Sequence, residues 1–181
     1  MSTRAQRRWA NTGGAALCAG LMGYALYTQH VLGLEPCPLC IFQRFAMIGL
    51  GVVFVVAALH APRGALARVY AALGALVAAT GLGISSWHVH IQNLPADRVP
   101  ACGPGLDYMW DAFPLADVLK MVFTGSGECH TINWSFWGLS MPFWVAIWFV
   151  ALGAWIVAVN WGAARRLSER YFTSNSSAIL K

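Results

Sequence analysis

Charged residues are scarce in this sequence. They make up 10% of its 181 residues, and only seven of them are acidic. A soluble globular domain has about 25% charged residues, so the shortage argues against that class. Hydrophobic residues instead form 58% of the chain, with nine Trp among them. The composition therefore predicts a small integral membrane protein.

Recognisable cofactor motifs are missing as well. The sequence has no haem-attachment motif and no flavin-binding fingerprint, and its five cysteines form no obvious metal cage. A redox function for this chain would therefore fit an electron acceptor that comes from outside it.

Four apolar stretches approach the roughly 20 residues that a helix needs to cross a bilayer core. They cover about 12–29, 41–59, 66–87 and 141–161. Arg4, Arg7 and Arg8 precede the first stretch as they would a signal peptide, but no polar mature domain follows it, so we interpret it as a retained span. We predict an all-α membrane protein with one domain, residues 1–181, built as a four-transmembrane-helix bundle.

The basic residues lie almost entirely on one side of these predicted spans. That side has a single acid, Glu169. Its basic residues are Arg4, Arg7, Arg8, Arg63, Arg68, Arg165, Arg166, Arg170 and Lys181. The positive-inside rule then places both termini and the tail at 162–181 in the cytoplasm. The asymmetry accounts for the pI of about 9.2 and gives no reason to expect a nucleic-acid partner.

The long loop at about 88–140 then lies on the non-cytoplasmic side, as does the start of the second span. Four of the five cysteines fall on this side, where disulfides persist: Cys37, Cys40, Cys102 and Cys129. Cys18 lies in the middle of the first span, and we interpret it as a small buried hydrophobe.

Within that loop, apolar residues recur at helical spacing, which predicts short amphipathic helices on the membrane surface. These residues are Leu115, Val118, Leu119 and Val122, with Trp110 and Phe113 nearby.

Cys37-Pro38-Leu39-Cys40 is a C-x-x-C pair at the start of the second span. The residue before a proline avoids the helix, and proline itself suits the first helical position. Cys37 is therefore the predicted N-cap, and Cys40 falls in the first turn, near unsatisfied N–H groups. Arg44 follows one turn later, at i+4 from Cys40. Both features favour a reactive thiolate at Cys40.

Two alternatives to redox chemistry stay open on spacing alone. The four cysteines on the non-cytoplasmic side, with His130 as a further candidate, could hold zinc in a metal-binding membrane protein. The pair Cys102 and Cys129 could instead be a structural staple of the loop. Against zinc, neither of these two belongs to a second C-x-x-C motif.

Arg44 has two interpretations. An arginine at the end of a span often only extends its charge to the membrane surface. Placed beside a redox thiol pair, it could instead donate hydrogen bonds to a lipid-soluble quinone and stabilise the charge that develops on it. His88 and His90, at the end of the third span, could lie near the same position.

Six segments carry a resemblance to a known family. They are "PCPLCIFQR", "WHVHIQNLP", "ACGPGLDYM", "FPLADVL", "GSGECH" and "WSFWGLSMP". On these motifs, in this order and over nearly its whole length, the chain resembles the DsbB family of bacterial disulfide bond formation proteins. One departure is Trp87, where members of the family often carry a charged residue.

The resemblance implies a thiol:quinone oxidoreductase of the bacterial inner membrane. Its catalytic residues would be Cys37, Cys40, Cys102 and Cys129. A reduced periplasmic oxidase of the DsbA type would attack a Cys102–Cys129 disulfide at Cys102. The released Cys129 would attack Cys37, and Cys40 would be freed beside the quinone.

The resemblance also implies the binding residues and partners. Arg44, His88 and Gln92 would lie at a ubiquinone or menaquinone, with no metal or flavin, and Trp134 would lie near the loop. The partners would be the soluble oxidase, the membrane quinone pool and the lipid bilayer.

Overall fold

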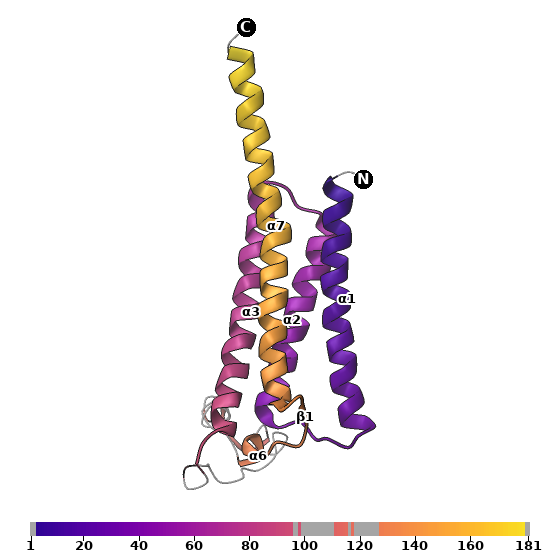
Figure 1. Ribbon diagram of the computed structural model, residues 1–181, viewed down its shortest axis with the longest axis vertical. Coiled ribbons are helices and arrows are strands. Elements are labelled where there is room, and N and C mark those ends of the chain that lie inside the picture. Colours follow the sequence, from indigo (N-terminus) through magenta and orange to yellow (C-terminus); the bar gives the residue numbers. More distant parts are fainter. Residues whose placement is uncertain (1–2, 96–97, 99–110, 116, 118–126, 180–181) are drawn as a thin grey trace.

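The computed structural model describes residues 3–95, 98, 111–115, 117 and 127–179. Four long helices run side by side, and a short helix and a hairpin lie at one end of them (Figure 1). The elements are α1 (Thr3–His30), α2 (Pro38–His60), α3 (Ala65–Gln92), α6 (Gly127–His130), β1 (Ser135–Phe136), β2 (Leu139–Ser140) and α7 (Met141–Ile179). The prediction of a mostly helical protein is confirmed.

Three helices in the described part of the chain are long and apolar enough to cross a membrane. They are α2, α3 and the first part of α7, Met141–Trp161. The fourth long helix, α1, falls short of that criterion, because Gly, Thr, Tyr and Gln dilute its apolar residues. Three of the predicted spans are therefore long and apolar enough to cross a membrane, while the fourth span stays a prediction.

A seam of small residues on α3 lets α7 approach closely. Its members recur at alternating steps of four and three residues, the spacing of a helix–helix seam. They are Ala67, Ala71, Gly74, Ala78, Gly81 and Ser85. A Cβ atom at Gly74 or Gly81 would come closer than 3.0 Å to Ile156 or to the ring of Phe149. Large α7 side chains therefore pack into the space left by small residues on the surface of α3, as is typical of helices packed in a membrane.

The inward face of α2 has the same spacing. Met47, Leu50, Phe54 and Ala57 are buried there, and the Phe54 ring fills the space beside Gly14 of α1. Met47, Leu50 and Phe54 form the main apolar core together with Cys18, Val53, Ala78 and the α7 residues Phe149, Leu152 and Ile156. The core occupies the middle of the bundle, and the buried polar pairs Asn11–Asn160 and Gln43–His88 lie toward its two ends.

One end of the bundle carries both chain termini and the α2–α3 connection (Figure 1). Arg7 donates to the backbone oxygen of Pro62, and Arg8 Nε donates to that of Ala58 at 3.2 Å. Asn11 and Asn160, both fully buried, exchange two hydrogen bonds of 3.3 and 3.0 Å between α1 and α7. The basic start of α1 therefore contacts the α2–α3 connection, about 50 residues away in the sequence, at this end.

At the opposite end of the bundle, α3 extends beyond the predicted span. This helix continues to Gln92, so the first residues of the predicted loop are its last turn. Most residues of the predicted amphipathic helices lie outside the described residues, including Trp110, Val118, Leu119 and Val122.

A hairpin at this end leads into α7. Strands β1 and β2 pair through a two-residue turn, Trp137-Gly138, with φ of 52° and 76°. Positive φ at both central residues is the mark of a type I′ turn, which matches the twist of paired strands. The Trp144 indole donates to Phe136 O at 3.2 Å, and the rings of Trp134 and Tyr24 pack edge to face. The hairpin thereby joins the start of α7 to α1.

Candidate redox site

Cys37 is the N-cap of α2, as predicted. Its backbone is extended (φ −68°, ψ 165°), Pro38 is the first helical residue, and the Cys37 Sγ accepts a hydrogen bond from the Cys40 N–H at 3.4 Å. The side chain thus satisfies one of the N–H groups that a helix leaves open at its start. This hydrogen bond holds the Cys37 side chain beside Cys40 in the first turn of α2.

The two sulfur atoms of this pair are in contact, with the Cys37 thiol donating to Cys40 Sγ at 3.0 Å. Hydrogen bonds with the sulfurs of Cys129 and Cys40, together with burial, raise the pKa of Cys37. This thiol therefore stays neutral where an ordinary cysteine would begin to ionise. Cys40, whose backbone N–H lies in the first turn at the positive end of the helix dipole, is left as the better carrier of negative charge.

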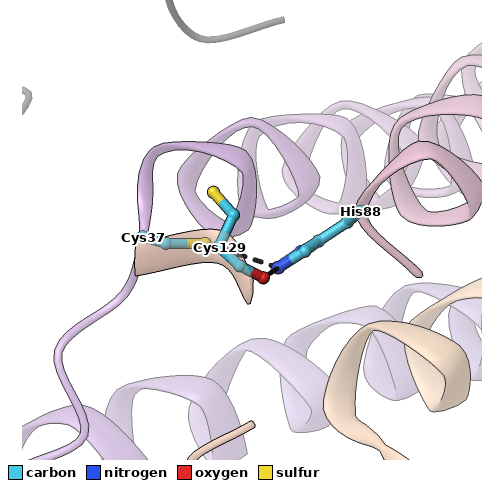
Figure 2. Close-up of side chains that lie close together, drawn as sticks. All are labelled: Cys37, His88 and Cys129. Atoms are coloured by element: carbon cyan, nitrogen blue, oxygen red, sulfur yellow. Dashed lines mark hydrogen bonds between the residues drawn. The ribbon is translucent and has the colours of Figure 1, made fainter. Parts of the chain in front are cut away.

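His88 reaches this pair from α3. It continues the seam of small residues by one further step and is almost fully buried. Its Nε2 lies 3.2 Å from the backbone oxygen of Cys129 and 3.7 Å from Cys37 Sγ (Figure 2). Its Nδ1 lies 3.2 Å from Gln43 Nε2. The Gln43 amide donates to Nδ1, so the ring hydrogen sits on Nε2 and faces the carbonyl oxygen and the sulfur.

Cys129 comes to the same place on the short helix α6. It is buried, and its Sγ, Cys37 Sγ and the His88 ring nitrogen all lie within 4.8 Å of one another. His130 holds the next position, with Nε2 3.2 Å from Leu94 O at the end of α3. One loop cysteine is therefore within exchange distance of the C-x-x-C pair. The other, Cys102, lies outside the described residues.

A cavity of about 410 Å³ opens beside the C-x-x-C pair, a size typical of small-molecule sites. The predicted residues that line it are Cys37, Cys40, Arg44, His88 and Gln92. Aromatic side chains from α1, the hairpin and α7 complete the walls: Tyr24, Trp134, Phe136, Trp144 and Trp148. Helices α1, α2, α3 and α7 all contribute, so the cavity depends on the whole bundle.

Two polar groups in this cavity differ in their surroundings. Arg44 donates to Gln29 Oε1 and, at 3.0 Å, to Ala25 O, both on α1. Gln92 Oε1 is buried and has no hydrogen-bond partner in the described part of the chain. A buried polar atom without a partner is costly, so this amide oxygen is suited to a ligand that can donate a hydrogen bond.

Gln43 is the site residue that the sequence argument missed. It is 5% exposed, lines the cavity and orients the His88 ring. A signal was available, because stepping back from Leu50 and Met47 at the seam spacing of α2 arrives at position 43. Its partner is 45 residues away in the sequence, so the pairing itself left no local pattern.

Comparison with known proteins gives the family. A family model described as "Disulfide bond formation protein DsbB" matches residues 7–159. The chain belongs to the DsbB family. It is 49% identical to the "Disulfide bond formation protein B" of Nitrosococcus oceani over 164 residues, 89% of this chain and 97% of that protein. The protein of the same name from Saccharophagus degradans is 53% identical over 135 residues, 75% of this chain and 81% of that protein.

Membership of the DsbB family gives the chemistry. A DsbB protein is a thiol:quinone oxidoreductase, which forms disulfide bonds and passes the electrons to quinone. The predicted enzyme class is therefore confirmed. The two rival functions, a metal-holding protein and a disulfide-stapled structural protein, are not favoured.

Proposed function

We propose that this chain reoxidises a DsbA-type thiol oxidase of the periplasm and delivers the two electrons to a membrane quinone through Cys37 and Cys40. The observation that carries the proposal is the meeting of three elements. Cys129 of α6, the C-x-x-C pair of α2 and the cavity that receives Arg44 and Gln92 all adjoin one another.

The exchange begins in the loop. A partner thiolate attacks the Cys102–Cys129 disulfide at Cys102 and releases Cys129 as a thiolate. Cys129 attacks Cys37 of the Cys37–Cys40 disulfide, and Cys40 leaves with the electron pair. The partner's second thiol then attacks the partner–Cys102 disulfide and releases Cys102. Cys102 attacks Cys129 in the Cys129–Cys37 disulfide, which re-forms Cys102–Cys129 and leaves Cys37 and Cys40 as two thiols.

The described contacts support this order. Cys129 Sγ lies within 4.8 Å of Cys37 Sγ, a short approach for attack. The first helical turn favours a negative sulfur on Cys40, and a stable leaving thiolate speeds exchange. His88 donates to the Cys129 carbonyl and lies 3.7 Å from Cys37 Sγ, which holds both cysteines at the junction.

The cavity fits a quinone head group by size and by its aromatic walls, and Gln92 Oε1, which has no partner among the described residues, would accept a hydrogen bond from a hydroxyl of the reduced quinol. A quinone would accept the two electrons and two protons that the Cys37 and Cys40 thiols lose as their disulfide re-forms. The Arg44 guanidinium and the Gln92 amide would hold it, and the aromatic side chains would keep water away. Both ring nitrogens of His88 already have protein partners, so its contribution lies at the cysteines.

The same proposal covers the placement in the membrane. Helix α1 acts as the fourth span, because it runs beside the three apolar helices (Figure 1). The basic end carries both termini and lies in the cytoplasm, which puts the cysteine end in the periplasm of the inner membrane.

The test is quinone reduction by the purified chain with a reduced DsbA-type partner or with a small dithiol. Cys102→Ser should lose the reaction with the partner but keep quinone reduction by the dithiol, while Cys40→Ser should lose both. Cys18→Ala, a buried cysteine of the core, is the matched control and should turn over normally. Equal behaviour of Cys102→Ser and Cys40→Ser with the dithiol would disprove the ordered relay.

A further inference from the structure

The place where Cys129 meets the C-x-x-C pair also contains a set of side chains that could bind a metal ion. Cys37, Cys129 and His88 offer two sulfurs and one ring nitrogen within 4.8 Å of one another, and all three residues are buried. Cys40 Sγ lies 3.0 Å from Cys37 Sγ. With Cys40, which is not part of that three-residue cluster, as a fourth ligand, the three thiols and one imidazole would make a Cys₃His set, one of the ligand combinations of tetrahedral zinc sites.

The spacing of these atoms suits a zinc ion. Zn–S and Zn–N bonds of about 2.3 and 2.0 Å place tetrahedral S and N ligands about 3.5 Å apart and S and S ligands about 3.8 Å apart. The distance from Cys37 Sγ to His88 Nε2 is 3.7 Å, close to that requirement. Cys40 Sγ lies outside the cluster whose ligand atoms are all within 4.8 Å of one another, so rotation of the Cys40 side chain would have to move its sulfur less than an ångström farther from Cys37 Sγ and closer to the other two ligands.

The surroundings of His88 also suit a ligand. A histidine that binds metal through one ring nitrogen usually hydrogen-bonds an oxygen with the other. Gln43 contacts Nδ1, and rotation of its amide would present Oε1 to an Nδ1–H. With the ring hydrogen moved to Nδ1, His88 would give up its hydrogen bond from Nε2 to Cys129 O, and the Nε2 lone pair would face the sulfurs. The cavity is lined by Cys37, Cys40 and His88 and provides the path by which an ion would enter.

We propose that the fully reduced chain binds one Zn²⁺ ion through Cys37, Cys40, Cys129 and His88, and that this ion blocks disulfide exchange until it is removed. Binding exchanges protons for metal–sulfur bonds: the bound thiols release their protons to solvent, and no electrons move. The oxidised chain lacks the site, because sulfurs joined in disulfides are no longer thiolate ligands. Zinc is here an inhibitor of one redox state and not a resident cofactor.

The binding test uses the full-length chain, purified in detergent without partner or quinone. One sample is reduced anaerobically and the other is oxidised. Zn²⁺ affinity is measured by competition with a chelator, and Cd²⁺ serves as a second probe because its thiolate bonds absorb in the ultraviolet. We expect one ion per reduced chain, with the thiolate absorption, and at least about 100-fold weaker binding to the oxidised chain. Equal binding in both states would overturn the proposal.

Variants identify the ligands. Cys40→Ser and Cys129→Ser remove one sulfur each with little change in shape, and each should weaken binding at least tenfold. Cys18→Ala removes a buried cysteine that belongs to the bundle core and should bind as wild type does. Gln43→Leu should weaken binding by about 10- to 100-fold, and Gln43→Glu should restore it, because a carboxylate also accepts from Nδ1–H. Unchanged binding in both serine variants, with wild-type circular dichroism, would rule the site out.

A turnover test addresses inhibition. Reduced chain loaded with one Zn²⁺ should be reoxidised by quinone at least tenfold more slowly than metal-free chain, and a chelator should restore the rate. Stoichiometric binding without this slowing would overturn the inhibitory part. Because binding is measured without quinone, a failure of the relay and a failure of the zinc site are separate results.

Discussion

Replacing Arg44 separates a quinone ligand from a structural clamp. The guanidinium lines the cavity and also donates to Gln29 and Ala25 of α1. A charge-assisted hydrogen bond contributes about 1.5–3 kcal/mol. If one such bond reaches the quinone, Arg44→Ala should lower apparent quinone affinity by about 10- to 150-fold, at about 1.36 kcal/mol for each factor of ten.

Arg44→Lys should have an intermediate effect. Lysine keeps the charge but loses the planar fork of donors, so it can replace the electrostatic part of the interaction and not its geometry. The measurement is steady-state quinone reduction with a small dithiol as electron donor, which gives KM and kcat for each variant. Thermal unfolding in detergent is followed in parallel, because loss of the two α1 hydrogen bonds should lower stability as well.

Gln29→Ala provides the matched control. It removes the main side-chain partner of Arg44 on α1 but leaves the cation in the cavity. If Arg44 binds quinone, Gln29→Ala should lower the unfolding temperature while changing quinone affinity less than about threefold. Wild-type quinone kinetics in Arg44→Ala, or an equal loss of affinity in both variants, would refute a direct role for the arginine.

Three further predictions concern the bundle, its orientation and the N-cap thiol. Gly81→Ala should destabilise the protein by about 1–3 kcal/mol, because the new Cβ would press on an aromatic ring of α7, whereas Gly83→Ala on the same helix meets nothing within 4 Å and should be neutral in thermal unfolding. Reporter fusions at Ala61 should give a cytoplasmic signal and those at Asp107, outside the described residues, a periplasmic one; the reverse pattern would invert the proposed orientation. In the reduced chain, the alkylation rate of Cys37 should rise only above about pH 8.5, the pKa of a free thiol, because the raised pKa of Cys37 keeps it protonated below that pH. A rise at lower pH would contradict the described hydrogen bonds.

The sequence predicted those features of the site that depend on neighbouring residues. The order Cys37-Pro38 is enough to define the helix start, and the structure confirms the cap and its bond to the Cys40 N–H. Long apolar runs likewise predicted helices that could cross a membrane, and three of them meet that criterion in the described part of the chain.

Features that depend on distant residues were not predictable in this way. The contact of Gln43 with His88 joins two helices, and that of Arg44 with Gln29 joins two others. Neither pair leaves a mark in local spacing. The hairpin was missed for a different reason: Trp137 occupies a turn position with positive φ that Asn, Asp and Gly usually fill, so its sequence lacked the usual signal.

The amide pair Asn11 and Asn160 has a consequence for how the protein is made. Hydrogen bonds between helices in a membrane contribute about 0.6 kcal/mol each, and at most about 1.7 kcal/mol, so two of them favour one relative depth of α1 and α7. Ribosomes synthesise α1 first and α7 last. Asn11 must therefore wait for almost the whole chain to be translated before its partner exists, so this pair can fix the relative position of α1 and α7 only after α7 has been made.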